Sequence, residues 1–270
     1  MGRLFVVGTL NVDTVVAVDR HPLPGETVMG GDPRQLWGGK GANQAISAAR
    51  NTGVDTAFVG RVGDDRAGEE YRSRLDSFGI DTQNLHATPG VPTGSAAIAV
   101  SSNSENTIIV SSGANARLDV SDLEVLGDLA PGDVVAATLE VPLPVIAQAA
   151  QRATAAGARF VLNFSPVIEL PRGVVEAADP VIVNEHEARE LNRQFGMLKS
   201  LLITRGAKGS EWDGIFVPAR SGLDVVDTTG AGDAYCGALA GELAKGSTRT
   251  EAMRVATNAA ADVVQRLGAQ

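Results

Sequence analysis

The feature that most constrains the fold of this chain is a regular alternation of short apolar runs with longer helix-like stretches. The first run, residues 4–7, is continuously hydrophobic and is closed by Gly8, which is typical of a strand buried on both faces. Alternating strands and helices with short connections predict an α/β fold with a mostly parallel sheet covered on both sides. Further strands are expected at 57–60, 134–138, 160–162, 181–183 and 201–204, and helices at 42–51, 67–78, 143–156, 185–195, 234–245 and 249–265.

Two regions, residues 14–37 and 87–113, break this alternation. They lack helical periodicity and contain β-branched pieces such as Thr-Ile-Ile-Val at 107–110. We interpret them as strands of one small sheet that forms a lid over the site, because long unstructured loops are uncommon in a compact domain. The alternative is two long surface loops. No internal repeat or linker interrupts the chain, so residues 1–270 are expected to form a single domain.

Composition excludes several classes of function. The chain has 32 acidic and 23 basic residues, a net charge of −9, which argues against a nucleic-acid partner. Its single cysteine, Cys236, lies in an apolar helical run and is expected to be a buried structural thiol in a reducing compartment. No apolar run has membrane-spanning length, and the chain starts without a signal-peptide pattern. These features predict a cytoplasmic protein with no membrane partner.

The stretch Asp-Thr-Thr-Gly-Ala-Gly-Asp at 227–233 leads into a predicted helix. Small residues at a helix start leave bare N–H groups at the positive end of the helix dipole, which is an anion site. In one interpretation this is a phosphoryl-transfer site in which Asp233 accepts a proton from the attacking hydroxyl. In the other, it is a glycine-rich turn with an ordinary first-turn aspartate. These seven residues do not decide between the two.

Polar side chains follow several predicted strands. Ligands of parallel sheets gather at the carboxyl ends of the strands, so these side chains are expected near one another. Asn11 and Asp13 alternate along an extended segment and therefore share a face. An amide beside a carboxylate suits the hydroxyls of a polyol. Each residue alone is more often a cap or a turn residue, but together they predict a site for a sugar. The others at this edge are Lys40 and Asn43, from a glycine-rich turn at 38–43, and Glu140, Asn163, Asn184 and Thr204.

Other routes to phosphate or catalysis have little support. The turn Gly-Gly-Lys-Gly at 38–41 does not match the spacing of a Walker loop, and no Gly-x-Gly-x-x-Gly follows the first strand. With three widely spaced histidines and one cysteine, a His/Cys metal site is not expected. No Gly-x-Ser-x-Gly elbow supports a serine hydrolase.

The stretches 38–45 and 227–233 resemble the two signatures of the ribokinase-like (PfkB) carbohydrate kinases. Asn-Val-Asp at 11–13, Pro-Gly-Glu-Thr at 24–27, Gly-Asp-Asp at 63–65, Leu-Glu-Val-Pro at 139–142 and Asn-Glu-His-Glu at 184–187 stand in the same order as in that family. The resemblance covers essentially the whole chain. Lys40 within the first signature is similar to the ribokinase branch more than to fructokinases or adenosine kinases.

The resemblance implies a three-layer α/β/α fold with a small β-sheet lid. It also implies ATP-dependent phosphorylation of the terminal hydroxyl of a pentose, with D-ribose as the first candidate and ribose 5-phosphate as product. Two alternatives stay open: another sugar or nucleoside kinase of the same fold, and a non-catalytic sugar-binding relative with a weakened ATP site. The aromatic content of 4% offers little for stacking a nucleoside base.

The resemblance also assigns roles to individual residues. Asp233 would be the general base, and Gly230, Ala231 and Gly232 would form the anion hole. The sugar would be held by Asn11, Asp13, Gly39, Lys40, Asn43 and Glu140, with Ala96 and Val110 of the lid closing over it. ATP would be bordered by Asn184, Thr204, Gly206, Lys208 and Asn258, and Glu187 would organise Mg²⁺ through water. Asn184 is equally well explained as a helix N-cap.

A potassium site is also implied by the resemblance, at Asp227, Thr229, Val263, Arg266 and Gly268. In the family a serine slightly further along completes that site, and the sequence given does not contain it. The segment 191–201 is also shorter than is usual in the family, and the usual final helix is missing. We expect these differences to affect ATP affinity and cation activation more than the sugar pocket. Exposed lid edges suggest a homodimer.

Overall fold

The central strand β1, Leu4–Val7, is buried along its whole length, as its four apolar residues predict. The computed structural model describes residues 1–103 and 105–270 of the chain. In it, β1 pairs in parallel with β4 on one side and with β8 on the other. Leu4 and Val6 belong to one hydrophobic cluster, and Phe5 and Val7 belong to another. Because side chains alternate along a strand, β1 contributes to a core on each face of the sheet.

Within the described residues the main sheet has nine strands in the order β13-β12-β11-β10-β9-β8-β1-β4-β5. All neighbours are parallel except at β12 and β13, so the predicted mostly parallel sheet is confirmed. Three strands were not predicted: β5, β12 and β13, which span only three or four residues and show too little periodicity. The strands are β1 Leu4–Val7, β4 Thr56–Gly63, β5 Leu85–Thr88, β8 Val134–Thr138, β9 Arg159–Asn163, β10 Ala178–Asn184, β11 Leu201–Thr204, β12 Ser210–Trp212 and β13 Ile215–Val217.

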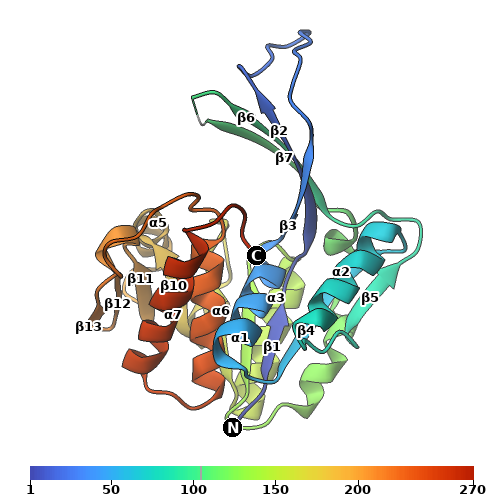
Figure 1. Ribbon diagram of the computed structural model, residues 1–270. Coiled ribbons are helices and arrows are strands. Elements are labelled where there is room, and N and C mark those ends of the chain that lie inside the picture. The colour runs from blue at the N-terminus through green and yellow to red at the C-terminus, as the bar shows by residue number, and fades with distance from the viewer. Residues whose placement is uncertain (104) are drawn as a thin grey trace.

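Helices cover both faces of this sheet, which confirms the three-layer α/β/α architecture (Figure 1). Buried residues of α1, α2, α6 and α7 pack in the cluster that contains Leu4, and those of α3, α4, α5 and the 3₁₀ helix η2 pack in the cluster that contains Phe5. No helix of the described part of the chain is long and apolar enough to cross a membrane. The helices are α1 Lys40–Thr52, α2 Arg66–Ser77, η1 Gly113–Arg117, η2 Val120–Asp128, α3 Leu143–Ala156, α4 Arg172–Ala177, α5 Glu185–Phe195, η3 Gly206–Lys208, α6 Ala231–Ala244 and α7 Arg249–Val263.

A second sheet projects from the body of the molecule, as Figure 1 shows. It consists of β2 Asn11–Val18, β3 Arg34–Gly38, β6 Ser95–Ser101 and β7 Asn106–Ser111, in the order β3-β2-β6-β7. The predicted accessory sheet is therefore confirmed, but its predicted limits of 14–37 and 87–113 were inaccurate. The sheet begins earlier, at Asn11, and residues 87 and 88 belong instead to β5 of the main sheet. We call this four-stranded unit the small sheet.

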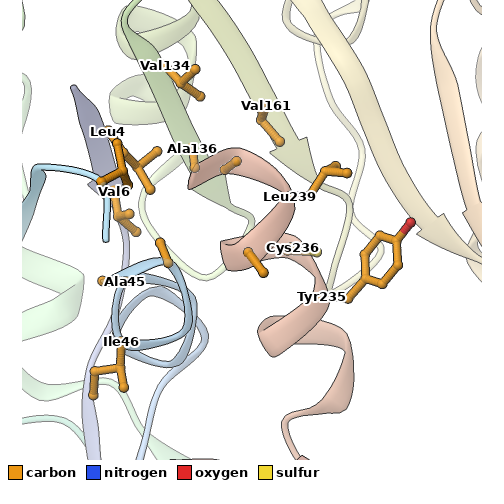
Figure 2. Packing of buried hydrophobic residues seen from close by; sticks show 14 of the residues in the cluster. Leu4, Val6, Ala45, Ile46, Val134, Ala136, Val161, Tyr235, Cys236 and Leu239 are labelled. Atoms are coloured by element: carbon orange, nitrogen blue, oxygen red, sulfur yellow. The ribbon is translucent and has the colours of Figure 1, made fainter. Parts of the chain in front are cut away.

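Helices α1 and α6 approach each other unusually closely because small residues line their contact. An added Cβ on Gly237 would lie 2.0 Å from the carbonyl oxygen of Gln44, so the α6 backbone rests directly on α1. The hydroxyl of Ser47 donates to the carbonyl oxygen of Ala234 at 2.7 Å. Figure 2 shows residues of α1 (Ala45, Ile46) and of α6 (Cys236, Leu239) that belong to the same cluster as Leu4 and Val6 of the sheet. Cys236 is buried in this cluster, as expected of a structural thiol.

The first prediction concerns this contact. We expect Gly237→Ala to lower the free energy of unfolding by about 1–3 kcal/mol, because its methyl group would overlap the backbone of Gln44. Urea denaturation measures the change. Gly173→Ala in α4 is the control, since nothing lies within 4 Å of a Cβ added there. Equal stability of the two variants would contradict the close approach of α1 and α6.

Candidate active site

The start of α6 is built as an anion site. Gly230 has a φ of +77°, and a Cβ on it would lie 2.4 Å from the Cβ of Ala269, so only glycine fits there. Gly232 differs, because an added Cβ would meet nothing within 4 Å and the space beside it is open. In the described part of the chain, the N–H of Ala231 contacts the carbonyl oxygen of Thr228 at 3.3 Å, while those of Gly232 and Asp233 have no protein acceptor. Two bare amides at the positive helix end can hold an anion.

Asp233 stands in the first turn of α6, only 8% exposed. The side-chain amide of Asn43 donates to its Oδ2 at 2.9 Å. Burial raises the pKa of Asp233, whereas the charge of Lys40 and the hydrogen bond from Asn43 act in the opposite direction; the net pKa lies above the ordinary value for aspartate. The carboxylate is thereby held as a better proton acceptor than an exposed aspartate.

Lys40, the first residue of α1, supplies positive charge to the site. Burial alone would lower the pKa of its ammonium group, but the neighbouring charges of Asp233, Glu140 and Glu187 raise it above the ordinary value. Lys40 therefore stays protonated in the pocket. Three carboxylates that belong to elements far apart in the sequence thus act electrostatically on one cation.

The turn before α1 fastens this helix to the connection between β1 and β2. Gly39 has a φ of +88°, and an added Cβ would lie 2.5 Å from the Cα of Leu10. The backbone N–H of Lys40 donates to Glu140 Oε2 at 3.2 Å, and the hydroxyl of Thr9 forms a short hydrogen bond to the same oxygen. Glu140 thus joins the end of β8 to the start of α1. The glycine turn and this carboxylate fix the pocket floor.

The small sheet brings further polar groups over this floor. Asn11 and Asp13 were predicted to follow a strand of the main sheet, and the structure places them inside β2 of the small sheet. Asp13 lies opposite Ala96 of β6, which lies opposite Val110 of β7, so the three share one face. Ala96 is 6% exposed and Val110 is 61% exposed. The structure therefore places the predicted lid residues in one row, with only the inner end covered.

Asp13 carries an unsatisfied oxygen. Its Oδ1 is buried and has no hydrogen-bond partner among the described residues. Burial raises the pKa of Asp13 to about 6; a hydrogen bond from the backbone of Ala96 opposes this shift and the charge of Glu140 adds to it. A buried acceptor without a donor costs free energy, so this oxygen is suited to a ligand hydroxyl.

A cavity of about 510 Å³ lies on the other side of the start of α6. Thr204, Gly206 and Gly232 line it, together with apolar residues such as Leu223 and Val225. The other predicted nucleotide residues lie elsewhere. Lys208 and Asn258 are exposed and do not line this cavity, whereas Thr257, which the sequence analysis did not single out, does line it.

A second hollow of about 590 Å³, at the opposite edge of the sheet around Gly2 and Lys245, contains none of the predicted site residues.

Asn184 and Glu187 form a capping box at the start of α5. Asn184 Oδ1 accepts from the N–H groups of His186 at 2.9 Å and Glu187 at 2.8 Å, and Glu187 Oε2 accepts from the N–H of Asn184 at 2.8 Å. The N-cap interpretation of Asn184 is therefore confirmed. Among the described residues, no three His, Cys, Asp or Glu side chains converge as a metal site.

The residues predicted to hold potassium lie on the loop before α6 and at the end of α7 with the segment after it, and these two parts of the chain meet. Asp227 Oδ1 accepts from the N–H of Thr229 at 2.9 Å, and its Oδ2 accepts from the N–H of Gly268 at 3.0 Å. Burial alone would raise the pKa of Asp227, but these hydrogen bonds lower it below the ordinary value. The N–H of Val226 also donates to the carbonyl oxygen of Val264 at 2.8 Å. The structure thus brings 226–229 beside 263–268.

Sequence reasoning missed several residues that support the site. Asn115 is buried and donates to Asn11 Oδ1 at 2.9 Å and to the carbonyl oxygen of Leu10 at 2.9 Å. Gln270 donates to Asn43 Oδ1 at 2.8 Å. Both stand more than a hundred positions from their partners and carry no local motif, so no signal in the sequence identified them. Thr9 could have been predicted, because it follows β1 just as Asn11 does and ligands gather at the carboxyl ends of parallel strands.

Comparison with known proteins identifies the family of the chain. Residues 1–270 match the profile of the pfkB family carbohydrate kinases. The chain belongs to the pfkB carbohydrate kinase family. Similar proteins include a ribokinase of Haemophilus influenzae, 34% identical over 295 residues that cover 99% of this chain and 94% of that protein. A bifunctional ribokinase/ribose-5-phosphate isomerase A of Fructilactobacillus sanfranciscensis is 34% identical over 293 residues, all of this chain, which spans only 54% of that relative.

Solved structures of this family share the fold. The structure of Arabidopsis thaliana ribokinase complexed with ribose and ATP superimposes with a TM-score of 0.88 at 31% identity, covering 99% of this chain and 94% of that chain. The predicted ribokinase-like fold is thereby confirmed.

The second prediction concerns Asp13, whose native pKa of about 6 exceeds the ordinary value of 3.8. Its contribution to stability is complete below pH 3.8 and is lost as pH rises to about 6, because only the native state then retains the proton. Asn cannot ionise, so the stability of Asp13→Asn relative to wild type should increase from pH 3.8 to about 6 and then stay constant. Urea denaturation across this range measures it; a pH-independent difference would contradict the buried carboxylate.

Proposed function

We propose that this chain is an ATP-dependent pentose kinase that transfers the γ-phosphoryl group of ATP to the terminal hydroxyl of D-ribose, giving ribose 5-phosphate. The observation that carries the proposal is the hydrogen-bonded pair of Asp233 and Asn43 at the start of α6, where the N–H groups of Gly232 and Asp233 are bare and Ala231 and Gly232 line an apolar cavity. Membership of the whole chain in the pfkB family supports it, as do relatives named ribokinase that the chain covers to more than nine-tenths of their length.

On the sugar side, acceptors and donors suit a polyhydroxy ligand. Asp13 Oδ1 would accept from a sugar hydroxyl and so gain the partner it lacks in the protein. Lys40 and Glu140 would contribute a cation and a carboxylate from the pocket floor, with the amide groups of Asn11 and Asn43 completing the set. Ala96 and Val110 would cover the sugar when the small sheet closes. The Gly38–Gly39 turn would provide the hinge, because glycine tolerates the dihedral changes that closure requires.

On the nucleotide side, the apolar cavity beside α6 would take the base of ATP. Its walls are formed largely by small and aliphatic residues, and Thr204 and Gly206 stand at its edge. The bare amides of Gly232 and Asp233 would hold the transferring phosphoryl group at the end of this cavity. The ATP-binding roles of Asn184, Lys208 and Asn258 rest on the family resemblance. Lys208 and Asn258 do not line the cavity, which argues against their contact with the base.

The reaction is an in-line displacement at phosphorus. The sugar hydroxyl oxygen forms a bond to the γ-phosphorus, the bond to the β–γ bridging oxygen breaks, ADP leaves, and the hydroxyl proton goes to Asp233. The two amides stabilise the charge on the phosphoryl oxygens in place of water. The raised pKa of Asp233 favours proton acceptance, and Asn43 holds the carboxylate in position.

Two cations belong to the proposal. Mg²⁺, which neutralises phosphate charge when bound, would be held by the nucleotide and by Glu187 through water, because magnesium usually keeps several of its waters. Potassium would lie between the loops 226–229 and 263–268, where Asp227, Thr229 and Gly268 already pack together, with Val263 and Arg266 alongside. A cytoplasmic location and the lack of a nucleic-acid partner stay predictions.

The third prediction tests the base. Asp233→Asn should lower kcat by about 10²–10⁴-fold with little change in the KM values for ribose and ATP, since the side chain keeps its size. ADP release is measured over a panel of pentoses, hexoses and nucleosides, with Asp128→Asn, an exposed residue of η2, as control. Turnover of the variant near the wild-type rate would remove Asp233 as base. Ribose binding by wild type without ADP release would favour the non-catalytic relative, and preference for nucleosides would favour a nucleoside kinase.

We also propose that the small sheet forms a homodimer. Every residue of its edge strand β7 is exposed, including Ile108, Ile109 and Val110, and such an edge is suited to pairing or packing with a second copy.

The fourth prediction follows from this edge. Ile109→Lys should shift the protein from dimer to monomer in analytical ultracentrifugation, because a buried unpaired charge is costly. Met197→Lys, an exposed hydrophobic residue of the main body, is the control and should leave the dimer intact. A wild-type monomer at all concentrations would contradict the dimer.

A further inference from the structure

The side chain of Gln270 lies in the middle of a hydrogen-bond network behind the candidate base. Its Nε2 donates to Asn43 Oδ1 at 2.8 Å and to the hydroxyl of Tyr71 at 2.7 Å, and its Oε1 accepts from Arg74 Nε at 2.8 Å. These residues come from α1, α2 and the segment after α7, three parts of the chain that are far apart in sequence. Figure 1 shows the C-terminal end beside the start of α1. The mechanism above does not use Gln270.

These contacts determine which way the Asn43 amide points. A side-chain amide has one oxygen acceptor and one nitrogen donor on opposite sides. Asn43 directs its nitrogen to Asp233 Oδ2 at 2.9 Å because its oxygen is held by Gln270. Reversal of the amide would turn its oxygen toward the Asp233 carboxylate, which is repulsive in a buried site. Arg74 fixes the Gln270 amide in the same way, since the guanidinium group can only donate and therefore takes its oxygen.

The network also extends to the base of the small sheet. The hydroxyl of Tyr71, a fully buried residue, donates to the carbonyl oxygen of Gly38 at 2.5 Å while it accepts from Gln270. Gly38 is the last residue of β3, and the ring of Trp37 beside it packs edge-on against Tyr71 at 5.0 Å between centroids. One side chain, Gln270, thus contacts both the residue that holds Asp233 and the residue that holds the end of β3.

We propose that Gln270 is a positioning residue that keeps the Asn43 amide donating to Asp233 and ties this pair to the base of the small sheet through Tyr71. The inference rests on the proposed function, because it requires Asp233 to act in catalysis. Asn43 is the one proposed sugar-pocket residue of the described chain to which Gln270 hydrogen-bonds, and Gln270 does not line the nucleotide cavity. Its loss should therefore affect turnover rather than ATP binding.

The fifth prediction compares Gln270→Glu with Gln270→Ala. Glutamate keeps the size of the side chain but can only accept, so it draws the nitrogen of Asn43 to itself and turns the amide oxygen toward Asp233. We expect kcat to fall by at least about tenfold, but by less than the ~10²–10⁴-fold loss expected when the base itself is removed, with the KM for ATP unchanged. Alanine leaves the Asn43 amide unfixed rather than reversed and should cause a smaller loss.

The pH dependence separates positioning from a merely structural role. The added negative charge and the reversed amide should raise the pKa of Asp233, so the acidic limb of the kcat profile should move to higher pH in Gln270→Glu and not in Gln270→Ala. The other groups near Asp233, namely Lys40, Glu140 and Cys236, are the same in both variants. Circular dichroism and thermal unfolding check that each variant is folded.

Gln265→Glu is the matched control, because Gln265 is exposed and donates to the Ala261 carbonyl oxygen on α7, away from the site. Wild-type kcat and an unshifted limb in Gln270→Glu, with Asp233→Asn still inactive, would overturn the inference and leave the proposed function intact. A wild-type protein that releases no ADP with any sugar would instead refute the proposed function. A similar shift in Gln265→Glu would show a general charge effect and also overturn the inference.

Discussion

The contact between α1 and α6 is the constraint on which the rest of the site depends. Asn43 and Asp233 stand 190 positions apart in the sequence. They meet because Gly237 has no side chain, so the backbones of the two helices can come into direct contact there. Both helices begin at a glycine with positive φ, so their amino ends open on the same side of the sheet. Because the starts of α1 and α6 are packed together, the bare N–H groups of α6 and the carboxylate of Asp233 lie in one place.

The site divides by chemistry between the two sheets. The main sheet, with the helices that follow its strands, supplies the amides of α6 and the apolar cavity, which are suited to phosphate and a base. The small sheet supplies Asn11 and Asp13, which are suited to hydroxyls. Movement of the small sheet would therefore act first on the sugar side of the site. The link between them runs through the Gly38–Gly39 turn, where Tyr71 holds the backbone.

The layered fold could be predicted because its signals are local, whereas much of the support for the site is not. Four apolar residues in a row define β1, and the two glycine turns mark the starts of α1 and α6. By contrast, Asn115 reaches Asn11 only through tertiary packing, and no periodicity or motif marks it. The limits of the small sheet were inaccurate for a similar reason: residues 85–88 form a strand only because β4 lies beside them. Asn258 was named by resemblance, yet its neighbour Thr257 faces the cavity, since one residue turns a helix by 100°.

The balance of charge around Asp233 explains why its direct partner is an amide. A cation bonded directly to this carboxylate would lower its pKa strongly and make it a poor proton acceptor. Burial alone would raise its pKa further. Lys40 acts at a distance and Asn43 donates a neutral hydrogen bond, and both only partly offset the effect of burial. A neutral donor must be oriented by something else, because an amide can present either end. In this chain the orienting group is a second amide, Gln270, which is itself oriented by Arg74.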